Sequence, residues 1–106
     1  MQFRGGMNEL MRQAARMQRK IDQAKSELKE RELTIEGLGG KVKVTVTLGR
    51  SVKRIDVDKA TLQSEDMDLV LDGVCAVLNQ GLEQADKQME AELDKVTGGV
   101  KIPGVV

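Results

Sequence analysis

The 106-residue sequence lacks the side chains that most often carry catalysis. It has no histidine, no tryptophan or tyrosine, one phenylalanine and one cysteine. Histidine is the commonest general base and the commonest metal ligand, so its absence argues against acid–base catalysis and against a metal centre. None of the serines has a base motif nearby, and Cys75 falls on an apolar helix face, where an inert core residue is expected. The sequence therefore predicts a protein that is not an enzyme and that uses no metal, cofactor or small-molecule substrate.

The sequence also lacks cysteine pairs and long apolar runs. A lone cysteine cannot form an intramolecular disulfide, which fits a reducing compartment. The first twenty residues contain five basic residues and no run of seven apolar ones, and no later stretch is long enough to cross a bilayer. We therefore expect a soluble cytoplasmic protein with no membrane partner.

Net charge is zero overall, but the two halves of the chain are oppositely charged. Residues 1–56 contain 13 basic and 7 acidic residues, for a net charge of +6, and residues 57–106 contain 4 basic and 10 acidic residues, for a net charge of −6. Such an asymmetry favours a polyanionic partner for the first half. In the alternative interpretation the basic helix lies against the acidic one within the fold, and the two explanations are compatible.

The first predicted helix spans residues 7–31 and carries a narrow apolar seam. Its apolar residues recur with alternating spacings of three and four, the heptad pattern of a helix that packs along a strip. We call these residues the apolar seam: Met7, Leu10, Ala14, Met17, Ile21, Ala24 and Leu28. Asn8 is the expected N-cap, and residues 1–6, which contain two glycines, are expected to form a flexible arm.

Three short segments with a period of two follow the helix. Residues 33–36, 41–48 and 52–57 alternate polar and apolar side chains, and the apolar ones are mostly β-branched. Glycines in the connections between them predict two hairpins and therefore a three-stranded antiparallel meander. Because such a sheet has one apolar face, helices must cover it.

A second long helix ends the predicted fold. Ser64 is its expected N-cap, and Gly98 and Gly99 are expected to end it, before a short apolar tail at residues 98–106. Its apolar face comprises Leu71, Val74 or Cys75, Leu78, Leu82, Ala85, Met89, Leu93 and Val96. We therefore predict one α+β domain over residues 1–106, with two layers and the order α-β-β-β-α.

Basic residues dominate one flank of the seam in the first helix. Arg12, Arg16, Arg19 and Lys20 are three or four residues apart and form a contiguous patch, which we call the basic stripe. Arginine suits phosphate because its guanidinium binds two oxygens at once. The near absence of aromatic residues argues against stacking on single-stranded nucleic acid, whereas a duplex needs only cations that match its phosphates. Further charge is expected on the sheet, from Lys41, Lys43, Lys53 and Arg54.

The length of the first helix points to a second copy of the chain. About 25 residues at about 1.5 Å each give a helix of roughly 37 Å, longer than a domain of this size is wide. Part of the seam must project into solvent or contact another chain, and in a two-fold homodimer the second copy would cover it. Such a dimer would also double the basic stripe.

Five segments together give the sequence a resemblance to the YbaB/EbfC family of bacterial nucleoid-associated proteins. They are MNELMRQAARMQ at residues 7–18, GGKVKVTV at 39–46, VKRIDV at 52–57, KVTGG at 95–99 and IPG at 102–104. The resemblance implies a two-layer fold, a tweezer-like homodimer and binding to duplex DNA with little sequence preference. It also implies altered DNA conformation, a place in the nucleoid, an influence on gene expression and no enzymatic activity. Of the basic stripe, only Arg12 and Arg16 lie in the matching segments, whereas Arg19 and Lys20 rest on the patch argument alone.

Two hypotheses for function follow from these observations. The first is a homodimeric nucleoid-associated protein whose basic stripe neutralises phosphates of duplex DNA. The second is a protein-interaction adaptor whose exposed seam recruits a partner from DNA replication or repair.

Overall fold

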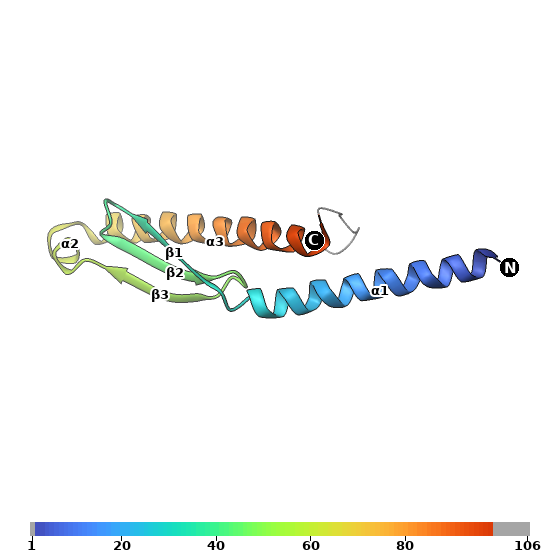
Figure 1. Cartoon of the computed structure of the whole chain (residues 1–106). Coiled ribbons are helices and arrows are strands. Elements are labelled where there is room, and N and C mark those ends of the chain that lie inside the picture. The colour runs from blue at the N-terminus through green and yellow to red at the C-terminus, as the bar shows by residue number, and fades with distance from the viewer. Residues whose placement is uncertain (1, 99–106) are drawn as a thin grey trace.

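The computed structural model describes residues 2–98, and the side chains from residue 6 onward. The chain forms α1 (Gln2–Leu28), β1 (Glu32–Gly37), β2 (Val42–Thr47), β3 (Val52–Val57), α2 (Lys59–Ser64) and α3 (Met67–Thr97). Figure 1 shows the sheet with α3 lying along it and α1 extending away from it. The predicted α+β fold is thus confirmed, with one short additional helix between β3 and the last helix.

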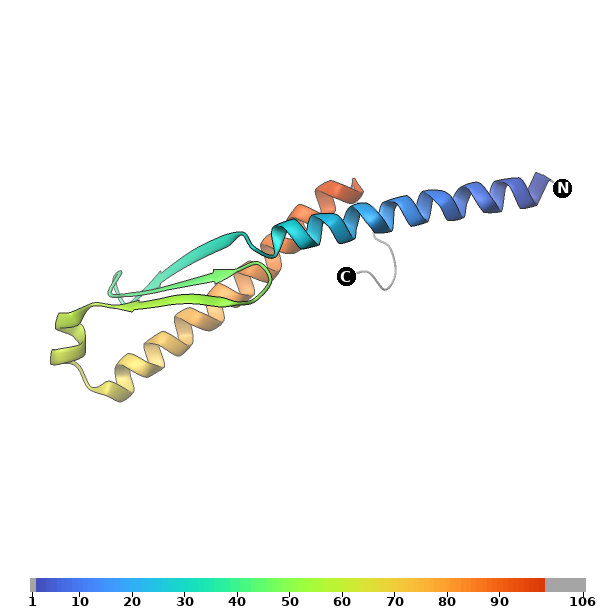
Figure 2. The same ribbon diagram turned by 90° about the horizontal axis from the view of Figure 1, so that it is seen from below.

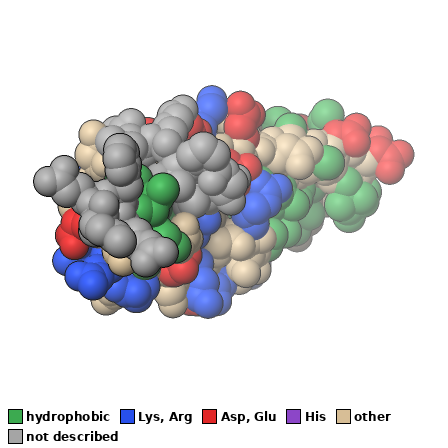
Figure 3. Space-filling model, turned by 90° about the vertical axis from the view of Figure 1, so that its right-hand side faces the viewer, with side chains coloured by type: hydrophobic (Ala, Val, Ile, Leu, Met, Phe, Trp, Pro, Cys, Tyr) green, Lys and Arg blue, Asp and Glu red, His purple; other side chains and the backbone are tan. Residues whose placement is uncertain are grey.

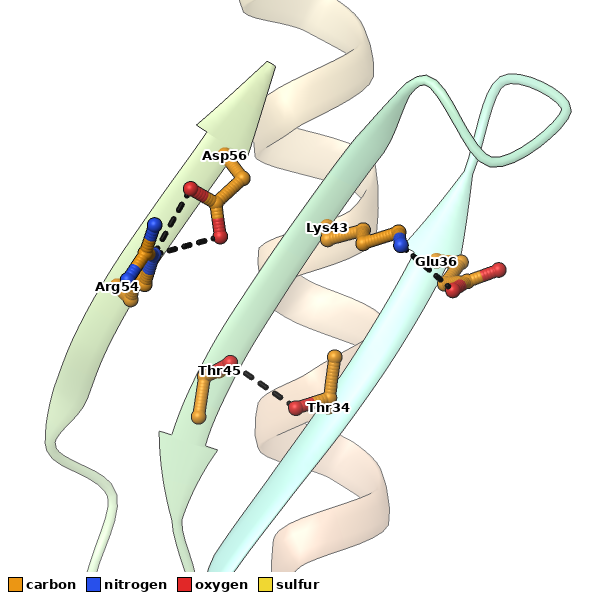
Figure 4. A network of polar contacts seen from close by, with 6 residues as sticks. All are labelled: Thr34, Glu36, Lys43, Thr45, Arg54 and Asp56. Atoms are coloured by element: carbon orange, nitrogen blue, oxygen red, sulfur yellow. Dashed lines mark hydrogen bonds and ion pairs between the residues drawn. The ribbon is translucent and has the colours of Figure 1, made fainter. Parts of the chain in front are cut away.

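The three strands form the predicted antiparallel meander in the order β1-β2-β3. Ile35 lies opposite Val44, and Val44 lies opposite Ile55, so these three side chains point to the same face of the sheet. Alternation along β2 buries its three valines completely on that face: Val42, Val44 and Val46. The other face is polar, and Figure 4 shows its cross-strand pairs with α3 passing behind β1 and β2.

Helix α3 covers the apolar face of β1 and β2. Its buried residues are Val70, Val77, Gly81 and Ala85. Gly81 faces Ile35 and Val46, and a Cβ at this position would lie 3.5 Å and 3.6 Å from them, at ordinary van der Waals distance. The core therefore consists of aliphatic side chains between one helix and two strands.

Glycine turns connect the strands as the sequence indicates. In the β1–β2 turn, Leu38, Gly39 and Gly40 have φ of 51°, 67° and 85°, a left-handed conformation that favours glycine. In the β2–β3 turn, Arg50 has φ of 70°, and the Ser51 backbone N–H donates to the buried hydroxyl of Thr47 at 3.1 Å. Both turns therefore hold the register of the meander.

The start of the first helix differs from the prediction. Asn8 does not cap α1, because the helix begins at Gln2 and both Gly5 and Gly6 lie within it. Glycine costs only about 1 kcal/mol in a helix interior, and each residue added to an existing helix gains a hydrogen bond. Residues 2–6 therefore continue the helix where an arm was expected.

The connection before α3 also differs from the prediction. Asp58, not Ser64, provides a side-chain cap: its carboxylate accepts hydrogen bonds from the backbone N–H and the hydroxyl of Thr61, each at 3.2 Å, which starts α2. Ser64 is the last residue of α2, and its hydroxyl donates to the Ala60 carbonyl at 2.7 Å. The N-cap residue of α3 is Asp66.

The apolar face of α3 lies partly outside the core. Val74, Leu78, Leu82, Met89 and Leu93 pack against the core as expected, whereas Leu71 and Cys75 are exposed. The expectation that Cys75 is a core residue is therefore wrong for the single chain, because the buried face of α3 is centred on Val77 and Gly81. Gly98, with φ of 64°, ends α3 as predicted, and the expected tail falls on residues 99–106, outside the described residues.

The C-terminal end of α1 is fixed to the rest of the fold. Leu28 belongs to the core, and Ala24 packs against it. The backbone N–H of Leu48 donates to Arg31, and that of Gly49 donates to Lys29, which joins the end of α1 to the β2–β3 turn. Arg31 also forms a 3.3 Å ion pair with Glu92 of α3. The pKa of Glu92 is lowered, mainly by a hydrogen bond from Lys95 and further by the positive charges of Lys95 and Arg31.

The N-terminal half of α1 stands clear of the domain (Figures 1 and 2). The molecule measures 77 × 18 × 17 Å, so the helix extends well beyond the sheet. Met7, Leu10 and Met11 are 60%, 63% and 64% exposed, whereas Ile21 and Leu28 are buried. The seam is thus covered near the domain and open along its projecting half, as the length of the helix predicts.

Gly37→Ala is expected to destabilise the domain by about 1–3 kcal/mol, because the core has no room for the added methyl group. The new Cβ would overlap a methyl group of Val77, which is buried beneath the β1–β2 turn. Gly6→Ala is the matched control, because a Cβ at this position in α1 meets nothing within 4 Å. Urea unfolding measures both variants, and a Gly37→Ala variant as stable as the wild type would contradict the packing described above.

Candidate nucleic-acid interface

The basic stripe spans the middle of α1, and its N-terminal end, Arg12, lies on the projecting half. At about 100° per residue, Arg12, Arg16 and Arg19 fall within roughly 60° of the helix circumference, and Lys20 extends this arc to about 100°. The structure therefore brings the four predicted residues to one face. That face is nearly opposite the seam, whereas the sequence analysis placed it on the flank of the seam. Contact between these residues and DNA stays a prediction.

The arginines of the stripe are open to solvent. The side chains of Arg12 and Arg16 are 74% and 57% exposed. Arg12, Arg16 and Arg19 line one shallow surface depression, whose floor includes the small side chain of Ala15. The three arginine side chains therefore border one site that is open to solvent and accessible to a phosphate group.

Glu9 is the one acidic partner of the stripe among the described residues. One of its carboxylate oxygens lies 3.3 Å from Arg16 Nη2, and the other lies 3.7 Å from Arg12 Nη1. Arg19 and Lys20 form no ion pair within the described part of the chain. The sequence analysis missed Glu9, although its spacing of three residues from Arg12 was a signal for this contact.

The acidic helix does not neutralise the stripe. Ion pairs between α3 and the rest of the described chain involve Arg31 at the end of α1, and Arg50 in the β2–β3 turn, which pairs with Asp86. Both lie at the sheet end of α1, away from Arg12 and Arg16. The alternative in which the two helices cancel each other's charge therefore does not account for the stripe.

The polar face of the sheet offers less positive charge than expected. Lys43 forms a 3.5 Å ion pair with Glu36, and the Arg54 Nε donates to both carboxylate oxygens of Asp56 at 2.8 Å (Figure 4). The hydrogen bond from Arg54 to Asp56 also raises the pKa of Arg54. Two of the four sheet cations are thus paired with one carboxylate each, whereas the two paired cations of the stripe share one, which makes α1 the stronger candidate for phosphate binding.

The end of the molecule opposite the projecting helix exposes a further group of apolar side chains. In Figure 3, viewed from the end that holds the projecting helix, Lys and Arg side chains gather on the nearer part and apolar side chains are exposed on the far part. Exposed apolar residues of the far part include Leu62, Met67, Leu69 and Leu71. Among the described residues, no helix combines the length and apolarity needed to span a membrane, and no group of side chains suits a metal ion.

Together these features define a class: a small two-layer α+β protein that presents an arginine-rich helix outside its core. A sequence profile of the YbaB/EbfC DNA-binding family matches residues 3–100. The chain belongs to this family, which confirms the resemblance seen in the sequence.

Comparisons with individual proteins agree with the family assignment. The chain is 35% identical over 104 residues to a nucleoid-associated protein of Acetivibrio thermocellus, covering 97% of this chain and 92% of that protein. It is 34% identical over 96 residues to a nucleoid-associated protein of Agathobacter rectalis, covering 91% of this chain and 85% of that protein. Its fold is similar to the crystal structure of an uncharacterised protein from Helicobacter pylori, with a TM-score of 0.72 and 18% identity, over 86% of this chain and 96% of that one.

Proposed function

We propose that the protein binds duplex DNA through the basic stripe of α1, as a homodimer and with little sequence preference. The observation that carries this proposal is the open depression that Arg12, Arg16 and Arg19 share along the middle of α1. A lone helix about 10–12 Å in diameter lets a duplex reach the stripe without collision with the sheet. The family and the names of the two relatives support DNA as the partner.

The mechanism is electrostatic. The stripe spans nine residues, or about 12 Å along the helix, which corresponds to about three phosphates of one strand along the duplex axis. Arginines and lysines placed on these phosphates release condensed counterions, and that release drives binding. Because phosphates carry no sequence information, contacts of this kind position the protein without reading bases. The family and the names of the relatives support a further part of the proposal: the protein coats or bends duplex DNA in the nucleoid of a bacterial cytoplasm and influences gene expression, with no catalytic step.

The homodimer is supported by apolar surface that one chain leaves open. Ile55 lies on the core face of the sheet opposite the fully buried Val44, yet it is 47% exposed because α3 packs on β1 and β2. Val52 on the same edge strand, Leu71 on α3 and the projecting part of the seam are also exposed. A second copy on these surfaces would extend the core and place two basic stripes on one duplex, in the form of tweezers.

The first test of this proposal is the salt dependence of DNA binding. If each dimer places eight stripe cations on phosphates, log K should fall linearly with log salt concentration with a slope of about −7. Anisotropy titrations of several unrelated labelled duplexes over a range of salt concentrations measure this slope, and all duplexes should give similar values. Binding that does not change with salt would contradict the mechanism.

The adaptor hypothesis makes a different prediction for the same protein. A partner of DNA replication or repair would be recovered in stoichiometric amounts on the immobilised chain, while affinity for duplex DNA near physiological salt would be negligible. The exposed Met7, Leu10 and Met11 favour this alternative, since they offer an apolar strip to a partner helix. The two measurements together separate the hypotheses.

A further inference from the structure

We propose that Glu9 competes with DNA phosphate for Arg12 and Arg16 and thereby limits the affinity of the basic stripe; this inference rests on the proposed function. The geometry assigns the two oxygens of one carboxylate to two different guanidinium groups, at 3.7 Å and 3.3 Å. Glu9 thus bridges the two arginines at the N-terminal end of the stripe.

Because of this bridge, the stripe has one part that is paired with a carboxylate and one part that is not. Arg12 and Arg16 already hold an anion, whereas Arg19 and Lys20 have no ion-pair partner within the described part of the chain. Ion pairs this exposed are weak, because Glu9 is 52% exposed and water screens its charge. A phosphate can therefore displace Glu9, and the bridge lowers the affinity without blocking the site.

Displacement does not remove the negative charge of Glu9 from the site. The carboxylate stays on the helix turn next to Arg12, within a Debye length of about 8 Å at physiological ionic strength, so it repels any phosphate bound there. Because Glu9 contacts Arg12 through Nη1 and Arg16 through Nη2, a phosphate at these two nitrogens has to compete with the carboxylate for the same positive charge. Glu9 is therefore a residue that tunes DNA affinity and keeps binding reversible.

Replacing Glu9 with glutamine tests this inference, because the substitution keeps the side-chain length and removes the charge. Glu9→Gln is expected to raise the affinity for a labelled duplex by roughly 3–10-fold near physiological salt and to steepen the salt slope by about one. Glu27→Gln is the matched control. It removes the same charge from the same helix face, five turns and about 27 Å away, and Glu27 forms no ion pair among the described residues. The control should leave the affinity and slope unchanged.

A double-variant cycle shows whether the effect passes through the two arginines. In a chain that carries Arg12→Ala and Arg16→Ala, the further change Glu9→Gln should give no gain in affinity. If Glu9→Gln raised the affinity equally with and without the two arginines, the inference would be overturned, since the gain would be a general charge effect. The same holds if Glu27→Gln raised the affinity as much as Glu9→Gln does. If the arginine variants weaken binding while Glu9→Gln changes nothing, the proposed function stands and the role of Glu9 is wrong. If the arginine variants bind as the wild type does, the proposed DNA site itself is wrong.

Discussion

Replacing Arg12, Arg16 and Arg19 together with alanine is expected to lower the affinity for duplex DNA by roughly 100-fold or more. A homodimer would lose six phosphate contacts at once, and the salt slope should become shallower by about five, since each contact contributes about 0.9. The loss should be similar on unrelated sequences, because phosphate contacts do not distinguish bases. Anisotropy titrations at two or more salt concentrations measure both quantities on the same samples.

The fold should survive this triple substitution. The three side chains line an open depression and contribute no residue to the core, and alanine is the best helix former. The matched control removes three cations from the sheet instead, through Lys43→Ala, Lys53→Ala and Arg54→Ala. Because this control removes the same number of charges from a surface outside the proposed DNA site, it should lose little affinity. Equal losses in both variants would show that total charge matters and not the stripe.

The sheet shows which features of the fold can be predicted from sequence. Along β2 every apolar residue is β-branched and every second residue is apolar, so local preference and burial indicate the same structure. Glycines at Gly39 and Gly40 then take the left-handed conformation that the turn needs. Where local and tertiary signals agree in this way, a single sequence predicts an element and its partners.

The helix boundaries show where sequence patterns are insufficient. Two adjacent glycines lower helix propensity at the start of α1, but propensity does not decide whether a helix already extending for many turns continues to Gln2. Before α3, two capping signals compete, and the preference for Asp58 depends on how the chain leaves β3. The exposure of Cys75 likewise depends on which face of α3 meets the sheet, which the apolar pattern around it does not determine.

For the candidate site, the sequence predicted the cations but not their partners. Spacings of three and four placed Arg12, Arg16 and Arg19 on one face, because the helix period is fixed. The pairing of Lys43 with Glu36 depends on the register of β1 against β2, and that register does not follow from the spacing of residues along the sequence. Two of the four sheet cations are therefore paired in the fold with one carboxylate each, whereas the two paired cations of the stripe share the single carboxylate of Glu9.

The second large effect is expected from a charge on the open core face of β3. Ile55→Glu should convert the proposed homodimer into a monomer, since a carboxylate buried in an interface without a partner is strongly unfavourable. The fold of each chain should persist, because the Ile55 side chain is 47% exposed in the single chain and a glutamate there can reach water. Light scattering measures the mass of the particle. Thr34→Glu is the control, since it adds the same charge to the same sheet on the exposed polar face, where Thr34 pairs with Thr45.

The monomeric variant also tests the tweezer arrangement, because two linked stripes bind far more tightly than one. Linking two sites to one duplex typically raises the affinity by about 100-fold to 10,000-fold, so Ile55→Glu should lose at least about 100-fold. Its salt slope should fall to about half of the wild-type value, since each monomer retains one intact stripe. A monomer with an undiminished slope would mean that one stripe makes all the phosphate contacts of the dimer. In that case the second stripe would be free for another duplex, and the dimer would bridge DNA segments instead of gripping one.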